Sequence, residues 1–155
     1  MIAISSNMAV IRKRHKVFTI FLMIVYLAFL FYFLFFAEDM GRTADISYQY
    51  NLVPFQEIRR FLRMIQIPQW RMAGLLNLAG NIIAFMPFAA FSSVLIHPKE
   101  RWYLITLLSF ELSLCVEIIQ LIAHLGCFDV DDLILNTLGG LLGYWVYRIW
   151  KHFVI

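Results

Sequence analysis

Charged residues are scarce in this chain, since Asp, Glu, Lys and Arg together make up only 15% of its 155 residues. Hydrophobic residues make up 62%, whereas an ordinary soluble domain is roughly 45–50% apolar and about 25% charged. A water-soluble protein of this size could not bury so much apolar surface. The composition therefore excludes an ordinary soluble domain and predicts that lipid surrounds most of the chain.

Cysteine is nearly absent as well, and only Cys115 and Cys127 occur. If both lay on one helix they would be about 18 Å apart, which is too far for a disulfide bond. Neither cysteine has a metal-ligand spacing, so we predict that both are structural.

Several functional motifs are missing. The sequence has no HExxH, GxSxG or P-loop motif, which favours binding over catalysis. It has no run of alternating basic and aromatic residues outside the hydrophobic segments, so its net charge of +3 indicates membrane topology rather than nucleic-acid binding. No internal repeat, low-complexity stretch or second domain is visible.

Long apolar runs are what the chain does contain. Residues 17–36 carry no charge and would form about 30 Å of helix, the thickness of the hydrocarbon core of a bilayer. A cleaved signal peptide has a shorter apolar region of roughly 7–15 residues, so a retained anchor is predicted after a tail at 1–16. The remainder, 37–155, is predicted to be one membrane domain with spans at about 75–96, 102–123 and 132–150. The expected fold is an all-α polytopic transmembrane bundle of about four spans.

Residues 54–67 have the pattern of an amphipathic helix. Apolar residues recur at helical spacing from Phe55 to Ile65, while Arg59, Arg60 and Arg63 fall on the opposite side. Such a helix lies on a membrane surface. Packing against the other spans and direct contact with lipid headgroups both remain open.

The distribution of basic residues predicts the orientation of the spans. With the N-terminus inside, the inner side carries eight Lys and Arg residues: Arg12, Lys13, Arg14, Lys16, Lys99, Arg101, Arg148 and Lys151. The outer side carries five: Arg42, Arg59, Arg60, Arg63 and Arg71. Because basic residues favour the cytoplasmic side, the basic cluster directly before the first span predicts that both the N- and the C-terminus are cytoplasmic.

Polar side chains inside the predicted spans are costly in lipid and mark function or helix pairing. Asn81, Glu117 and Asn136 fall at a similar depth on three spans, about 6–7 Å to the outer side of the span centres. Other polar residues lie toward the outside or share these faces: Asn77, Gln120, His124, Asp129, Asp131 and Asp132. We predict a single polar pocket open to the outside. The alternative is that these groups only form hydrogen bonds between helices, worth about 0.6 kcal/mol each.

Two other features of the spans need separate explanations. Glu111 lies off the polar face and close to the middle of its span, where it would be protonated or face another helix. Gly139 and Gly143 are expected to serve packing, because small residues allow helices to approach closely.

Four stretches occur in order along the chain: Asn51-Leu-Val-Pro-Phe55, Asn77-Leu-Ala-Gly-Asn81-Ile-Ile-Ala-Phe85-Met-Pro87, Glu117-Ile-Ile-Gln120 and Asp129-Val-Asp-Asp132-Leu-Ile-Leu-Asn136-Thr-Leu-Gly139. Together they resemble the VanZ-like family over roughly residues 50–146. The resemblance implies a small protein of the bacterial cytoplasmic membrane, in a family whose named member is associated with teicoplanin resistance. The family usually has an Arg just before the acidic motif, and Leu125-Gly126-Cys127-Phe128 stands in that place here.

These observations give two main functional hypotheses. The first is a binding protein whose outward pocket takes an envelope lipid, a lipid-linked cell-wall precursor or a lipoglycopeptide, and so contributes to glycopeptide resistance. The second is an intramembrane enzyme acting on an envelope lipid, with Glu117 as acid or base and a divalent cation held by Asp129, Asp131 and Asp132. A third is a subunit or chaperone of a larger envelope complex, and the protein could also form an oligomer. The residues expected to bind the ligand are Asn51, Arg59, Arg63, Asn77, Asn81, Glu117, Gln120, His124, Asp129, Asp132 and Asn136.

Overall fold

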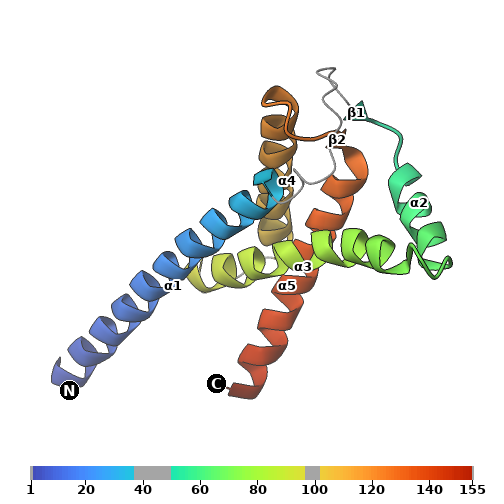
Figure 1. Cartoon of the computed structure of the whole chain (residues 1–155). Helices are drawn as coiled ribbons and strands as arrows, with labels where there is room; N and C mark the ends of the chain where they lie inside the picture. The colour runs from blue at the N-terminus through green and yellow to red at the C-terminus, as the bar shows by residue number, and fades with distance from the viewer. Residues whose placement is uncertain (1, 37–49, 97–101, 155) are drawn as a thin grey trace.

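The computed structural model describes residues 2–36, 50–96 and 102–154 (Figure 1). In these ranges the chain forms helices α1 (Ile2–Phe36), α2 (Gln56–Ile65), α3 (Arg71–Leu95), α4 (Trp102–Ile122) and α5 (Val130–Val154). Two short strands, β1 (Tyr50–Asn51) and β2 (Phe128–Asp129), complete the described elements. The prediction of a mainly helical membrane protein with an amphipathic segment is confirmed in outline.

Three of these helices are long and apolar enough to cross a membrane: residues Arg14–Phe35 of α1, and the whole of α3 and α4. The fourth predicted span corresponds to α5, which is not among them, so four spans are not confirmed. The helix α1 begins far earlier than the predicted anchor at residue 17. Residues 2–36 contain no proline or glycine, so no residue of the basic tail interrupts the helix.

Helix α5 packs closely against α3 and α4, and α3 crosses α5 near the middle of both helices (Figure 1). A Cβ atom added at Gly139 would overlap the carbonyl oxygen of Ile82, and one added at Gly143 would lie 2.7 Å from the Cα of Met86. These two glycines therefore serve the close packing that was predicted for them.

Helix α1 is held against α3 and α4 by polar contacts within an apolar surface. The Tyr26 hydroxyl donates a hydrogen bond to the carbonyl oxygen of Ala84, and the rings of Tyr26 and Phe91 lie 5.9 Å apart. Near the other end of α1, Gln120 Nε2 donates to the carbonyl oxygen of Leu34 at 3.1 Å. Each bond gives a polar side chain, the Tyr26 hydroxyl or the Gln120 amide, a backbone carbonyl as its acceptor.

The strands β1 and β2 form a parallel pair that the sequence did not predict. Tyr50 lies opposite Phe128, and Asn51 lies opposite Asp129. Strand β2 leads directly into α5, while β1 is followed within a few residues by α2. The pair therefore holds the beginning of α2 next to the beginning of α5.

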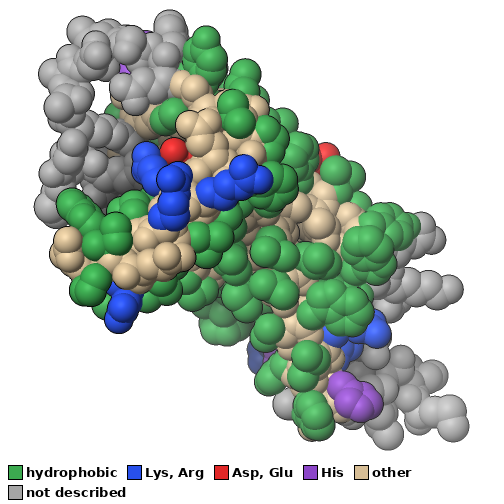
Figure 2. Space-filling view, turned by 90° about the vertical axis from the view of Figure 1, so that its right-hand side faces the viewer, with side chains coloured by type: hydrophobic (Ala, Val, Ile, Leu, Met, Phe, Trp, Pro, Cys, Tyr) green, Lys and Arg blue, Asp and Glu red, His purple; other side chains and the backbone are tan. Residues whose placement is uncertain are grey.

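Helix α2 has the amphipathic character that was predicted for residues 54–67. Phe61 is buried, and its backbone carbonyl would lie 2.8 Å from a Cβ atom added at Gly74 of α3. Arg59, Arg60 and Arg63 are exposed. Figure 2 shows basic groups gathered over one part of a surface that is otherwise mainly hydrophobic.

Candidate functional site

Asp129 connects three segments that lie far apart in the sequence. Its backbone N–H donates to Glu117 Oε2 on α4 at 2.9 Å. Its Oδ1 accepts a hydrogen bond from Asn51 Nδ2 of β1 at 3.2 Å and another from the backbone N–H of Asp131 at 2.8 Å. Glu117 is only 2% exposed. A buried carboxyl group of α4 therefore lies beside the beginning of α5.

Asp131 caps the N-terminus of α2 from a different part of the chain. Its Oδ1 accepts from the backbone N–H of Phe55 at 2.5 Å, and its Oδ2 accepts from that of Ile58 at 3.0 Å. The first N–H groups of a helix lack partners within the helix, and they favour a negative charge. Phe55, which precedes α2 with a φ of 65°, supplies no side-chain cap. The carboxylate of Asp131 takes that place.

A second layer of polar contacts is made by Asp132, the next residue of α5, and by Asn136 one turn beyond it. Asn81 Nδ2 on α3 donates to Asp132 Oδ1 at 2.5 Å. Asn136 Nδ2 donates to Ser113 Oγ on α4 at 2.9 Å, while Asn136 Oδ1 is buried and has no hydrogen-bond partner. A buried acceptor without a partner is costly, and it can accept a hydrogen bond from a water molecule or a ligand.

We call the residues of these two layers the polar cluster; they are Asn51, Asn81, Ser113, Glu117, Asp129, Asp131, Asp132 and Asn136. The cluster is rich in acid groups. Burial, reinforced by the neighbouring carboxylate of Asp131, raises the pKa of Asp129 above its ordinary value. The pKa of Glu57 at the beginning of α2 is raised as well, first by burial and then by Asp129 and Asp131.

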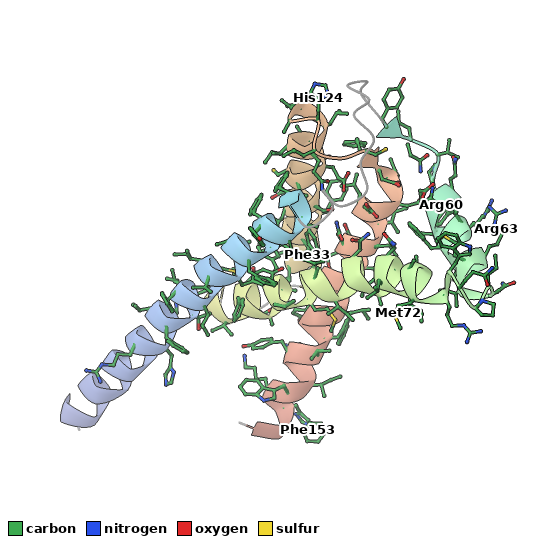
Figure 3. All side chains as sticks on the ribbon, viewed as in Figure 1. Phe33, Arg60, Arg63, Met72, His124 and Phe153 are labelled. Atoms are coloured by element: carbon green, nitrogen blue, oxygen red, sulfur yellow. The ribbon has the colours of Figure 1, made fainter. Side chains whose placement is uncertain are left out.

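Among the exposed arginines of α2, Arg60 lies close to these acids. Arg60 pairs with Glu57 at 2.8 Å, and its charge lowers the pKa of both Glu57 and Asp129 against the larger effect of burial. Arg63 instead donates from Nε to the backbone carbonyl of Arg59 at 3.3 Å. Arg63 lies on the outer side of α2 (Figure 3).

Other residues predicted for the site lie apart from the polar cluster. Asn77 is exposed, and its Nδ2 donates to the carbonyl oxygen of Ala73 in its own helix. Gln120 is buried but contacts α1, as described above. His124 is exposed at the end of α4 with a φ of 55° (Figure 3). The predicted pocket residues therefore divide into a connected set and a peripheral set.

The divalent cation of the enzyme hypothesis finds no support in these contacts. In the described ranges, no three His, Cys, Asp or Glu side chains are grouped so that they could hold a metal ion. Asp129, Asp131 and Asp132 each accept a hydrogen bond from a different segment instead, from β1, α2 and α3 respectively.

Two roles in the cluster were missed by sequence reasoning. Ser113 receives the hydrogen bond of Asn136, and its position one helical turn from Glu117 was the available signal. The cap that Asp131 provides for α2 had no signal in the sequence, because it depends on the pairing of β1 with β2.

The comparisons with known proteins agree with this architecture. The family model for VanZ/LLP1 matches residues 21–151, which extends the resemblance into the first span. The chain is 34% identical over 104 residues to Protein VanZ of Enterococcus faecium, an alignment that covers 64% of this chain and 52% of that protein. The chain thus spans about half the length of the curated relative it matches, and no solved structure matches it. Because the family model covers most of the chain and includes every helix of the polar cluster, the chain belongs to the VanZ/LLP1 family.

Proposed function

We propose that this protein binds an envelope lipid, a lipid-linked cell-wall precursor or a lipoglycopeptide at the polar cluster, and thereby contributes to resistance against glycopeptides of the teicoplanin type. The observation that carries the proposal is the buried hydrogen bond from the backbone N–H of Asp129 to Glu117 Oε2, with Asn136 bonded to Ser113 one turn away on the same helix α4. A fold that needed only helix packing would not require a carboxyl group that is 2% exposed beside further acids. The unpartnered Asn136 Oδ1 offers a ligand an acceptor that the protein leaves unused.

The proposal includes α5 as a fourth span. Its 25 residues would reach about 37 Å along the helix axis, which exceeds the hydrocarbon core of about 30 Å. Its hydropathy is lowered by charged residues toward its two ends and by Asn136 within it, and Asn136 and the glycines face α3 and α4 rather than lipid. The acids of its first turn and Lys151 in its last turn would lie near the two interfaces.

We propose that the protein lies in the membrane with both termini on the cytoplasmic side and with α2 on the outer side. Arg42, Lys99 and Arg101, which were counted for the predicted orientation, lie outside the described residues. In a protein without native cysteines, Gln66→Cys should react with a membrane-impermeant maleimide in intact cells, and His152→Cys should react only after the cells are opened. Both side chains are exposed. Labelling in the reverse pattern would place the polar cluster on the cytoplasmic side.

The exposed arginines of α2 are proposed to contact anionic headgroups at the outer surface. Arg59→Gln with Arg63→Gln should weaken binding of phosphatidylglycerol, because each basic residue near an anionic surface contributes about 1 kcal/mol. Native mass spectrometry of the detergent-solubilised protein with added phosphatidylglycerol or phosphatidylcholine measures this directly. Arg60 is left unchanged because it pairs with Glu57. Equal retention of both lipids by the variant and the unmodified protein would show that these arginines are merely solvated.

Resistance itself tests the proposal in cells. Expression in a glycopeptide-susceptible Gram-positive host should raise the inhibitory concentration of teicoplanin, and Glu117→Gln should remove that increase at equal membrane levels. The carbonyl oxygen of a glutamine can still accept the hydrogen bond from Asp129 N–H, so packing survives while the ionisable group is lost. Asn77→Ala is the matched control, since Asn77 contacts only its own helix among the bonds described above. Full resistance with Glu117→Gln would refute the proposed role of the cluster.

A further inference from the structure

Glu111 lies on the face of α4 that points away from the rest of the protein. The buried residues of α4 include Ser109 and Ser113, both fully inaccessible. At about 100° per residue, Glu111 points roughly opposite to both serines. Its side chain is exposed, so this carboxyl group belongs neither to the polar cluster nor to the packing of α4 against α5.

The depth of Glu111 makes this exposure costly. The helix α4 runs from Trp102 to Ile122, and Glu111 lies one residue from its midpoint. It is therefore about 15 Å from either end of the span, farther than a glutamate side chain can extend. An ionisable group at the middle of a span almost always faces another protein helix or a water-filled cavity. We conclude that lipid alone does not cover this face.

The residues around Glu111 form a seam of the kind that joins two parallel helices. Leu104, Leu107, Leu114 and Ile118 lie seven and four residues before Glu111 and three and seven after it. This is the spacing of the a and d positions of a heptad repeat, with Glu111 at a central a position. Leu107 and Ile118 are 50% and 41% exposed. A single polar residue within such a seam sets its register.

We propose that a second copy of this chain packs on this face, forming a parallel α4–α4 contact in which the two Glu111 side chains hydrogen-bond to each other. Two-fold symmetry about the membrane normal places identical residues at the same depth. The two carboxyl groups then face each other, so each copy supplies the hydrogen-bonding partner for the other. A different protein would need a polar group at this depth on a matching seam. A second copy always has one, because its own Glu111 lies at the same depth.

Cross-linking in native membranes tests this contact. In a protein carrying Cys115→Ala and Cys127→Ala, oxidation should link Ile118→Cys into dimers. Phe110→Cys should react far less, because Phe110 is exposed but lies about 100° from Glu111 around the helix. Equal cross-linking at the two positions, or none at position 118, would overturn the proposal.

A measurement without cysteines separates a specific contact from chance collisions. Energy transfer between labelled copies in liposomes should persist as lipid is added. Glu111→Leu should then reduce the dimer population about tenfold at limiting protein, because it removes the hydrogen-bonded pair. Glu111→Gln should retain most of it, because two amides can still pair. Unchanged association in Glu111→Leu would show that Glu111 does not form the contact, and the outcome does not depend on the ligand proposed above.

Discussion

Replacing Gly139 by alanine should destabilise the protein by about 3 kcal/mol, although only one methyl group is added. The new Cβ would overlap the carbonyl oxygen of Ile82 and lie 2.9 Å from its carbonyl carbon. Neither atom can move without shifting the backbone of α3, so α5 must separate from α3. Because α5 carries Asp131, Asp132 and Asn136, the polar cluster would be displaced with it. Thermal unfolding of the detergent-solubilised protein, followed by size-exclusion fluorescence, measures the loss.

Gly80 provides the matched control for this substitution. It also lies within a helix, yet a Cβ atom added there would meet nothing within 4 Å. Gly80→Ala should therefore be neutral or stabilise the protein by up to about 1 kcal/mol, since alanine favours the helix. If both alanine variants unfold at the same temperature, the close contact between α3 and α5 is not what holds the bundle together.

Replacing Asp131 by alanine should release the N-terminal turn of α2 from α5. The backbone N–H groups of Phe55 and Ile58 would lose a shared, charged acceptor, and each buried donor left without a partner costs about 1–3 kcal/mol. A loss of about 2 kcal/mol corresponds to roughly thirtyfold faster opening. Amide hydrogen exchange in residues 56–65, measured by mass spectrometry, should rise by that factor while exchange in α3 and α4 changes little.

The control for Asp131 is a nearby acid that does not cap the helix. Glu57 lies in the first turn of α2 and pairs with Arg60 across one helical turn. A pair within one helix whose arginine is exposed contributes less than about 1 kcal/mol, so Glu57→Ala should leave exchange in α2 almost unchanged. Equal exchange in the Asp131→Ala variant and the unmodified protein would mean that water caps α2 equally well.

The helices could be predicted because their signals are local. Apolar runs of sufficient length located α1, α3 and α4 to within a few residues, apart from the N-terminal extension of α1. The amphipathic spacing located α2, and the spacing of Gly139 and Gly143 predicted close packing. Each of these features depends on a pattern that lies within one element, so no knowledge of the tertiary arrangement was needed.

The contacts of the site were harder to predict because they join distant segments. Asn77 and Asn81 share a face of α3, yet only Asn81 reaches α5, because Asp132 lies at its level. Asn77 returns to its own backbone instead. Similarly, strands of two residues have no periodic pattern, so the sequence could not show that β1 and β2 pair. The sequence predicted similar depths for Asn136 and Glu117, but Asn136 donates to Ser113, which lies one helical turn from Glu117 on α4.

Direct binding to the purified protein tests the central claim, that the polar cluster is a ligand site. In lipid nanodiscs, isothermal titration with teicoplanin and, separately, with a lipid-linked cell-wall precursor should show saturable binding of at least one of them. Binding should be unchanged in Asn77→Ala, which lies off the cluster, and at least about tenfold weaker in Glu117→Gln, as expected when a buried ionisable group is lost from a site. Saturable binding that Glu117→Gln leaves intact, or no binding of either compound to the unmodified protein, would contradict the account.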